Sequence, residues 1–104
     1  LNTGHDGGWA TIHANGARDV PARLAALGAL ADMGEEAVAA QAASAFDAVL
    51  HMRRSPCGHR WVSEVGVLTR ARGPLACEVA LSATASGQVT TNEAWSSLAR
   101  KAGL

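Results

Sequence analysis

The chain has 104 residues, which is enough for one small domain. Hydrophobic residues make up 48% of the chain and charged residues 17%, so the composition predicts a packed core and excludes disorder. The chain has 9 basic residues (Lys and Arg) and 9 acidic residues (Asp and Glu), so its net charge is zero. This removes the general electrostatic argument for nucleic-acid binding. The local basic positions are Arg53-Arg54 and Arg70 with Arg72.

A glycine-rich loop is predicted at the start of the chain, over residues 1–8, because glycine permits backbone conformations that other residues resist. A short strand is predicted to follow at Trp9–His13, where Thr11 and Ile12 are β-branched. Asn15-Gly16 is a turn signal and is expected to end this strand.

Two helices are predicted next. Asp19 or Asn15 can cap the first one, Pro21 fits its first turn, and the run 32–34 ends it. Glu35-Glu36 opens the second helix, where acidic side chains complement the helix dipole. The apolar positions at helical spacing are Val20, Leu24, Leu27 and Ala31 in the first helix, and Val38, Ala42, Ala45 and Phe46 in the second.

An antiparallel meander is predicted for the second half of the chain. Its strands are expected at Phe46–Met52, Arg60–Thr69 and Leu75–Leu81, with turns at Ser55–Gly58 and Arg70–Pro74. The side chains expected to share a face are Trp61, Val65 and Val67 on one strand, and Leu75, Cys77, Val79 and Leu81 on the next. The polar run Thr84–Thr91 is predicted to be a loop, and Asn92–Ala102 a last short helix.

The loop Gly4-His5-Asp6-Gly7-Gly8 can present backbone N–H groups to an anion. It is not a Walker A loop, because no Lys-Ser/Thr pair follows the glycines. His5 and His13 can donate hydrogen bonds to a phosphate. A tight loop with a solvent-facing histidine, and a local role for His13 at the strand end, explain the same residues, and spacing alone does not decide between these interpretations.

Metal binding and cysteine chemistry are not supported by the remaining motifs. Cys57 and Cys77 lie in no CxxC motif, so reduced thiols are expected. Cys57-Gly58-His59 is too short for the usual zinc spacing, and nothing marks a base beside either thiol. The histidines also lack the paired His-x-Thr/Ser motifs of two-histidine phosphodiesterases.

The run TGHDGGWATIHANGARDVPARL, residues 3–24, resembles the His box of the secretion-superfamily ATPases. These enzymes power type II and type IV secretion, type IV pili and the Tad/Flp pilus, and their motif reads approximately TGH-x-G-S-x-x-T-x-HA-N, followed by a helix with Arg-Asp and Arg-Leu. The matching residues are Thr3, Gly4, His5, Gly7, Thr11, His13, Ala14, Asn15, Arg18, Asp19, Arg23 and Leu24.

The resemblance extends over roughly residues 2–70, through Phe46–His51 and Arg60–Val65, and looks most like the Tad pilus or conjugal-transfer-associated branch. Gly8 and Trp9 depart from the family pattern. The Walker A loop, the acidic box and the Walker B strand are absent and are expected upstream of Leu1.

What the resemblance implies is an α/β fold, the C-terminal part of a RecA-like P-loop ATPase domain with a small antiparallel β meander and a C-terminal helix. Residues 1–104 would be a partial ATPase domain, with the His-box loop, strand and helices in 1–54 and the meander and tail in 55–104. The parent protein would be a hexameric ATPase using ATP and Mg²⁺. The chain alone would bind neither, would hold no catalytic residue or metal, and would be inactive.

The resemblance also implies roles for single residues. Gly4, His5, Gly7, Thr11 and His13 would sense the nucleotide. In addition, Arg18 and Arg23 would face the neighbouring subunit or hold the adjoining helix by ion pairs.

Expected partners are the protein's own subunits in a homo-hexamer and the secretion or pilus platform proteins of the inner membrane. Direct contact with nucleic acid is not expected. No apolar run is long enough to span a bilayer, and the expected location is cytoplasmic, at the inner face of the membrane. A non-catalytic remnant or interaction module of the same fold, and an unrelated small α+β domain, remain the alternatives.

Overall fold

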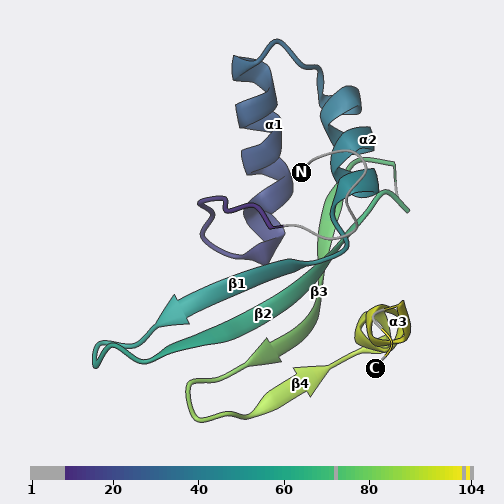
Figure 1. The fold of residues 1–104 in the computed structure, drawn as a ribbon. Coiled ribbons are helices and arrows are strands. Elements are labelled where there is room, and N and C mark those ends of the chain that lie inside the picture. The colour runs from purple at the N-terminus through teal and green to yellow at the C-terminus, as the bar shows by residue number, and fades with distance from the viewer. Residues whose placement is uncertain (1–8, 72, 102, 104) are drawn as a thin grey trace.

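A four-stranded antiparallel sheet in the order β1-β2-β3-β4 organises the chain (Figure 1). The computed structural model describes residues 9–71, 73–101 and 103. Figure 1 shows α1 and α2 side by side at one end of the sheet, and α3 apart from them near β4. The elements are a 3-10 turn η1 (Ala17–Asp19), α1 (Val20–Leu30), α2 (Glu35–Ala45), β1 (Val49–Arg54), β2 (Arg60–Thr69), β3 (Ala76–Ala83), β4 (Val89–Thr91) and α3 (Glu93–Lys101).

The predicted meander is present, with one more strand than expected. Thr84–Thr91 was predicted to be a loop, but Val89–Thr91 pairs with β3, so this prediction was wrong for its last residues. The pairing of Val89 with Ala83 and of Thr91 with Leu81 forms a short, fully exposed edge strand. Helices combined with this antiparallel sheet are compatible with the predicted α/β class.

Two β-bulges change which side chains share a face of the sheet. Ser63 is the extra residue of β2 against β1, and Ala80 is the extra residue of β3 against β2. Because each bulge reverses the alternation of side chains, Trp61 lies on the opposite face from Val65, and Leu81 on the opposite face from Cys77. The prediction that Trp61 shares a face with Val65, and Leu81 a face with Cys77, was therefore wrong.

The helix boundaries follow the local signals in the sequence. Pro21 lies in the first turn of α1, and Asp19 precedes the helix without a side-chain capping bond. The backbone N–H of Met33 donates to the carbonyl of Gly28 at 2.8 Å and closes the end of α1. Gly28 also lets the helices approach each other, because a Cβ at this position would lie 2.3 Å from a methyl carbon of Val38 on α2.

The apolar stripe predicted on α1 is buried only at the start of the helix. Val20 is buried and Leu24 packs against the core, whereas Leu27 is 42% exposed and Leu30, which widens the same stripe, is 87% exposed. On α2 the buried positions include Val38, Ala39 and Ala42. The far ends of the two helices therefore extend beyond the sheet and leave apolar side chains in solvent.

The predicted strand at Trp9–His13 is wrong. Residues 9–14 have no regular secondary structure, although Ile12 and Ala14 pack against the core. A strand needs a hydrogen-bonded neighbour, and none of the described strands pairs with this segment. The β-branched residues Thr11 and Ile12 favour a strand, but this segment has no pairing strand among the described residues.

The core lies where η1 meets the sheet. Ala17 is fully buried, and a Cβ added to Gly66 of β2 would lie 3.3 Å from the Cβ of Ala17 and 2.4 Å from Sγ of Cys77. The bare Cα of Gly66 thus allows η1 to contact the sheet surface. The buried cluster consists of Ala17, Val20, Ala42, Leu68 and Cys77.

The last helix is held at both ends, at one by the sheet and at the other by the segment between α2 and β1. The side-chain oxygen of Asn92 accepts a hydrogen bond from the backbone N–H of Ala94 at 3.0 Å, while its amide donates to the carbonyl of Val79 at 2.9 Å. At the other end, Nζ of Lys101 lies 2.7 Å from a carboxylate oxygen of Asp47. The predicted C-terminal helix is therefore confirmed, with Asn92 as its cap.

Replacing Gly66 with alanine should lower the free energy of unfolding by about 1–3 kcal/mol, because the new methyl group overlaps Sγ of Cys77. Chemical denaturation followed by circular dichroism measures this change. Gly34→Ala is the matched control, since no atom lies within 4 Å of the added Cβ there. Equal stability of the two variants would contradict the close contact at Gly66.

Candidate functional site

Of the residues predicted to sense a nucleotide, Gly4, His5 and Gly7 lie outside the described residues. Thr11 and His13 are exposed, in the irregular segment that leads to η1. His51 belongs to β1 and His59 to the β1–β2 turn.

The described part of the His-box segment, residues 9–16, leads into η1. Glu64 bonds the start of η1 to the sheet. The backbone N–H of Ala17 donates to Oε1 of Glu64 at 2.9 Å. The same oxygen lies 3.4 Å from where a Cβ of Gly16 would be, so the carboxylate sits directly under the chain as it enters η1. A buried N–H needs a partner, and Glu64 supplies it from a strand that is 47 residues further along the sequence.

A bulge in β2 lies directly before Glu64. The extra residue Ser63 is 6% exposed, and its hydroxyl donates to the backbone carbonyl of His51 at 3.1 Å. Glu64 faces η1 as Gly66 does two residues further along the strand. Because of the bulge, Ser63 lines the same pocket as its neighbour Glu64.

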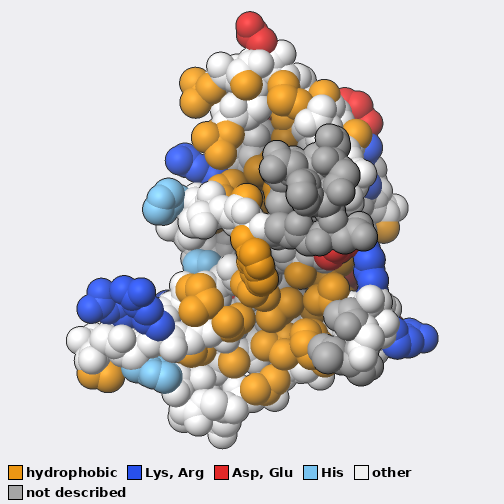
Figure 2. All heavy atoms as spheres, in the orientation of Figure 1, with side chains coloured by type: hydrophobic (Ala, Val, Ile, Leu, Met, Phe, Trp, Pro, Cys, Tyr) orange, Lys and Arg blue, Asp and Glu red, His pale blue; other side chains and the backbone are white. Residues whose placement is uncertain are grey.

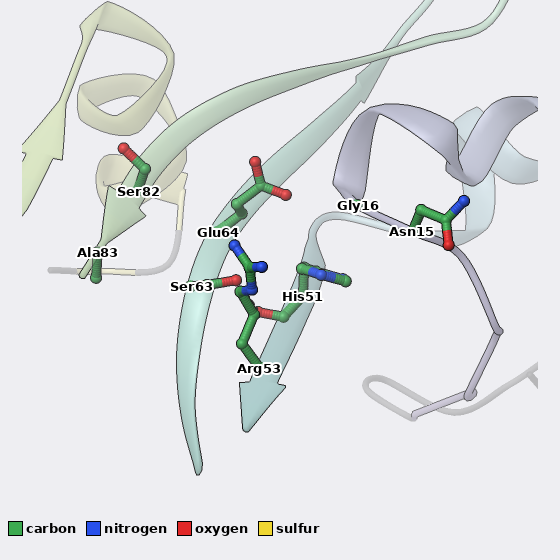
Figure 3. A pocket seen from close by; sticks show the side chains of 8 residues that line it. All are labelled: Asn15, Gly16, His51, Arg53, Ser63, Glu64, Ser82 and Ala83. Atoms are coloured by element: carbon green, nitrogen blue, oxygen red, sulfur yellow. Dashed lines mark hydrogen bonds between the residues drawn. The ribbon is translucent and has the colours of Figure 1, made fainter. Parts of the chain in front are cut away.

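A polar pocket of about 280 Å³ opens between this segment and the sheet (Figure 3). Figure 3 shows Asn15 and Gly16 on one side and the side chains of His51, Arg53 and Glu64 on the sheet. The lining residues are Asn15, Gly16, His51, Arg53, Ser63, Glu64, Ser82 and Ala83. Asn15 is the last residue of the His-box motif, so the pocket joins that motif to three strands.

The chemistry that this pocket supports is polar recognition. Arg53 and His51 offer hydrogen-bond donors to an anion, Glu64 offers an acceptor, and Asn15 offers both. No group of three His, Cys, Asp or Glu side chains that could hold a metal ion occurs among the described residues.

The two cysteines are free thiols in different environments, Cys57 exposed and Cys77 buried. Burial raises the pKa of the Cys77 thiol from 9.0 to about 11, with a further contribution from the negative charge of Glu64. The thiol of Cys77 is thus protonated at neutral pH and acts as a small apolar group. Cys57 is exposed, and a hydrogen bond from the Ser55 hydroxyl lowers the pKa of its thiol.

The two arginines predicted at a subunit boundary are both exposed, Arg18 on η1 and Arg23 on α1. The ion pairs of the described residues join Arg70 to Glu36 and Lys101 to Asp47, so neither Arg18 nor Arg23 holds the adjoining helix through a described carboxylate. Their guanidinium groups are accessible to a partner.

Two functional positions were not assigned a role from the sequence. Glu64 was noted only as part of the motif around Val65, and Arg53 only as a local basic position. The signal that could have found Glu64 is its place in a strand with a neighbouring Ser63, both polar in an otherwise apolar run.

The family model for "Type II/IV secretion system protein" matches residues 1–102. The chain belongs to this family. The family assignment drawn from the His box is therefore confirmed. The match also reaches α3, far beyond the residues that carry the motif.

Relatives of this secretion-family chain occur in Mycobacterium tuberculosis. Two curated proteins, one from strain CDC 1551 / Oshkosh and one from strain ATCC 25618 / H37Rv, are each named "Putative conjugal transfer protein" and are 47% identical to the chain over 73 residues. The alignment covers 70% of this chain and 21% of each relative, so the chain spans about a fifth of their length. No solved structure matches the chain significantly.

Replacing Glu64 with alanine should lower the free energy of unfolding by about 1–3 kcal/mol, because the buried N–H of Ala17 loses its acceptor. Glu64→Gln retains an oxygen at the same place and should lose less. Thermal and urea unfolding measure both variants. Glu78→Ala removes an exposed carboxylate from β3 and serves as the control; an equal loss in that variant would contradict the role of Glu64 as an anchor.

The stability of the fold should decline above pH 9, because the unfolded thiol of Cys77 ionises near 9 and the buried one only near 11. The contribution of the protonated Cys77 thiol to the free energy of unfolding is complete below pH 9, and it falls by about 2 kcal/mol by pH 11. The chain has no tyrosine, so few other groups titrate in this range. Urea unfolding at a series of pH values should show a smaller decline for Cys77→Ala than for Cys57→Ala; identical profiles would rule out this origin.

Proposed function

We propose that the chain is the C-terminal portion of a hexameric ATPase that powers type II/IV secretion, Tad-type pilus assembly or conjugal transfer through ATP binding and hydrolysis. The family match over residues 1–102 carries this proposal. The names of the two mycobacterial relatives support the conjugal-transfer branch. In this proposal the fold belongs to a RecA-like P-loop domain.

The attachment of the His-box segment gives the proposal a physical basis. The segment holds Thr11 and His13, and its exit is tied to β2 by the bond between Ala17 and Glu64. In the proposed enzyme, His5 contacts the γ-phosphate side of the nucleotide, Thr11 bonds in the same shell and His13 supports the junction with η1. Movement of this segment on loss of the γ-phosphate then reaches the sheet through Glu64, as in other switches that respond to a phosphate.

ATP and Mg²⁺ are held by other parts of the protein in this proposal. The chain has no Gly-x-x-x-x-Gly-Lys-Ser/Thr loop, so the lysine that grips the phosphates comes from outside residues 1–104. Hydrolysis in P-loop enzymes depends on positioning and electrostatic stabilisation, and histidine N–H donors contribute to both. Gly4 and Gly7 would let the backbone approach the nucleotide closely.

Assembly and location complete the proposal. Arg18 and Arg23 are exposed and would contact the neighbouring subunit of the ring. Among the described residues, no helix has the length and apolar character needed to cross a bilayer. We place the protein at the inner face of the membrane, bound to the platform proteins of a secretion or pilus system.

Steady-state hydrolysis of ATP by the full-length protein tests the proposal. His5→Ala and His13→Ala should each lower kcat by about tenfold or more, because a group that acts at the phosphate is lost. Gln88→Ala, an exposed residue of the β3–β4 turn, should hydrolyse ATP at the wild-type rate. A full-length protein that neither binds nor hydrolyses ATP would instead identify a non-catalytic relative of the family.

A further inference from the structure

Basic side chains gather at the outer end of the β1–β2 hairpin, although the net charge of the chain is zero. Residues 48–63 contain three arginines and two histidines and no Asp or Glu. The arginines are Arg53, Arg54 and Arg60, and all are exposed. Figure 2 shows the blue side chains clustered at this projecting end, away from the helices.

The register of the hairpin places like charges against each other. Arg54 is paired directly with Arg60 in the last rung of the ladder, so these two side chains share one face, whereas Arg53 is paired with Trp61 on the other face. Like charges opposite each other destabilise an antiparallel pair. Neither of the ion pairs among the described residues involves Arg54 or Arg60, so the charge of this pair is not neutralised there. An anion bound at the hairpin end would relieve this repulsion.

A fixed aromatic platform accompanies the arginines. The indole Nε1 of Trp61 donates to the backbone carbonyl of Ala83 at 3.0 Å, which holds the ring in place. The ring of His59 stacks on Trp61 with centroids 5.8 Å apart and planes within 10°. His59 is exposed, so its supported ring is accessible to solvent. Arg53 is paired with Trp61 and projects from the same face of the hairpin.

We propose that this hairpin end, defined by Arg53, Arg54, His59, Arg60 and Trp61, is a binding site for single-stranded nucleic acid. The strand crosses the end of the hairpin: a base stacks on His59, and phosphodiester groups contact Arg53 on that face and Arg54 with Arg60 on the other. Cationic side chains beside a stacking ring are the combination that binds single strands without sequence preference. A lipid headgroup surface would use the arginines but has no aromatic ring to place on His59.

The zero net charge of the chain predicts no binding of nucleic acid. The fold separates the charges: residues 24–47 carry only acidic side chains, and residues 48–63 carry only basic ones. The local field at the hairpin end is therefore positive in a neutral chain. The expected salt dependence is modest. The logarithm of the binding constant should fall by about 0.7 per phosphate contact for each unit of the logarithm of salt concentration, which is about 2 for the contacts of three arginines.

Fluorescence anisotropy with a labelled oligothymidylate of about 20 nucleotides tests this site on the full-length protein, without ATP. The variant R53Q/R54Q/R60Q should reduce affinity at least about tenfold at low salt and lower the salt slope by about 2. Arg100→Gln, an exposed arginine on α3, is the matched control and should leave both quantities unchanged. His59→Ala should weaken binding, whereas His59→Phe should retain it, because the stack is preserved.

Several results would overturn the proposal. Unchanged binding by the triple variant, or no binding by the wild type at low salt, removes the hairpin end as a nucleic-acid site. Binding to vesicles of equal parts phosphatidylcholine and phosphatidylserine, lost in the triple variant and without binding to the oligothymidylate, would identify a membrane contact instead. Circular dichroism checks that the triple variant is folded, which is expected because the repulsion between Arg54 and Arg60 is gone. The result is independent of ATP hydrolysis.

Discussion

The contact between η1 and the sheet is the constraint on which the rest of the structure depends. Ala17 is fully buried, its N–H is bonded to Glu64, and Gly66 leaves it the room to lie against the strands. This contact sets the position of α1, because Val20 begins that helix directly after η1 and is buried in the same cluster. It also sets the position of the His-box segment that precedes η1. The bond between Ala17 and Glu64, next to a glycine that leaves room for η1, thus helps to join the helical layer to the sheet.

Local signals in the sequence were sufficient for most of the elements. Glu35 and Pro21 lie in the first turns of the helices they were expected to open, and the turn at Ser55–Gly58 connects the two strands that were expected on either side. These predictions succeeded because charge, proline geometry and glycine torsions act within a few residues. The antiparallel pairing of the central strands followed from short connections, which leave no room for a crossover.

Features that depend on distant partners were missed. The bulges at Ser63 and Ala80 show no local signal, since each is defined by the register of a neighbouring strand. β4 is fully exposed, so it has no apolar alternation to detect, and Trp9–His13 had the propensity of a strand but no pairing partner. For the site, the motif indicated the family and the segment around His13. It could not indicate that Glu64 and Arg53 meet Asn15 at one pocket, because that meeting depends on the register of β1 against β2 and on the packing of η1 on the sheet.

The close approach at Gly66 also constrains how this surface can change over evolutionary time. The same small space in the core is shared by Ala17, Gly66 and Cys77. A larger residue at one of these positions therefore requires a smaller residue at another, or a greater distance between η1 and the sheet. Two of the three are already the smallest side chains available. Related chains should therefore vary at these positions together or not at all, and a chain that has enlarged one of them alone should show its His-box segment displaced from the strands.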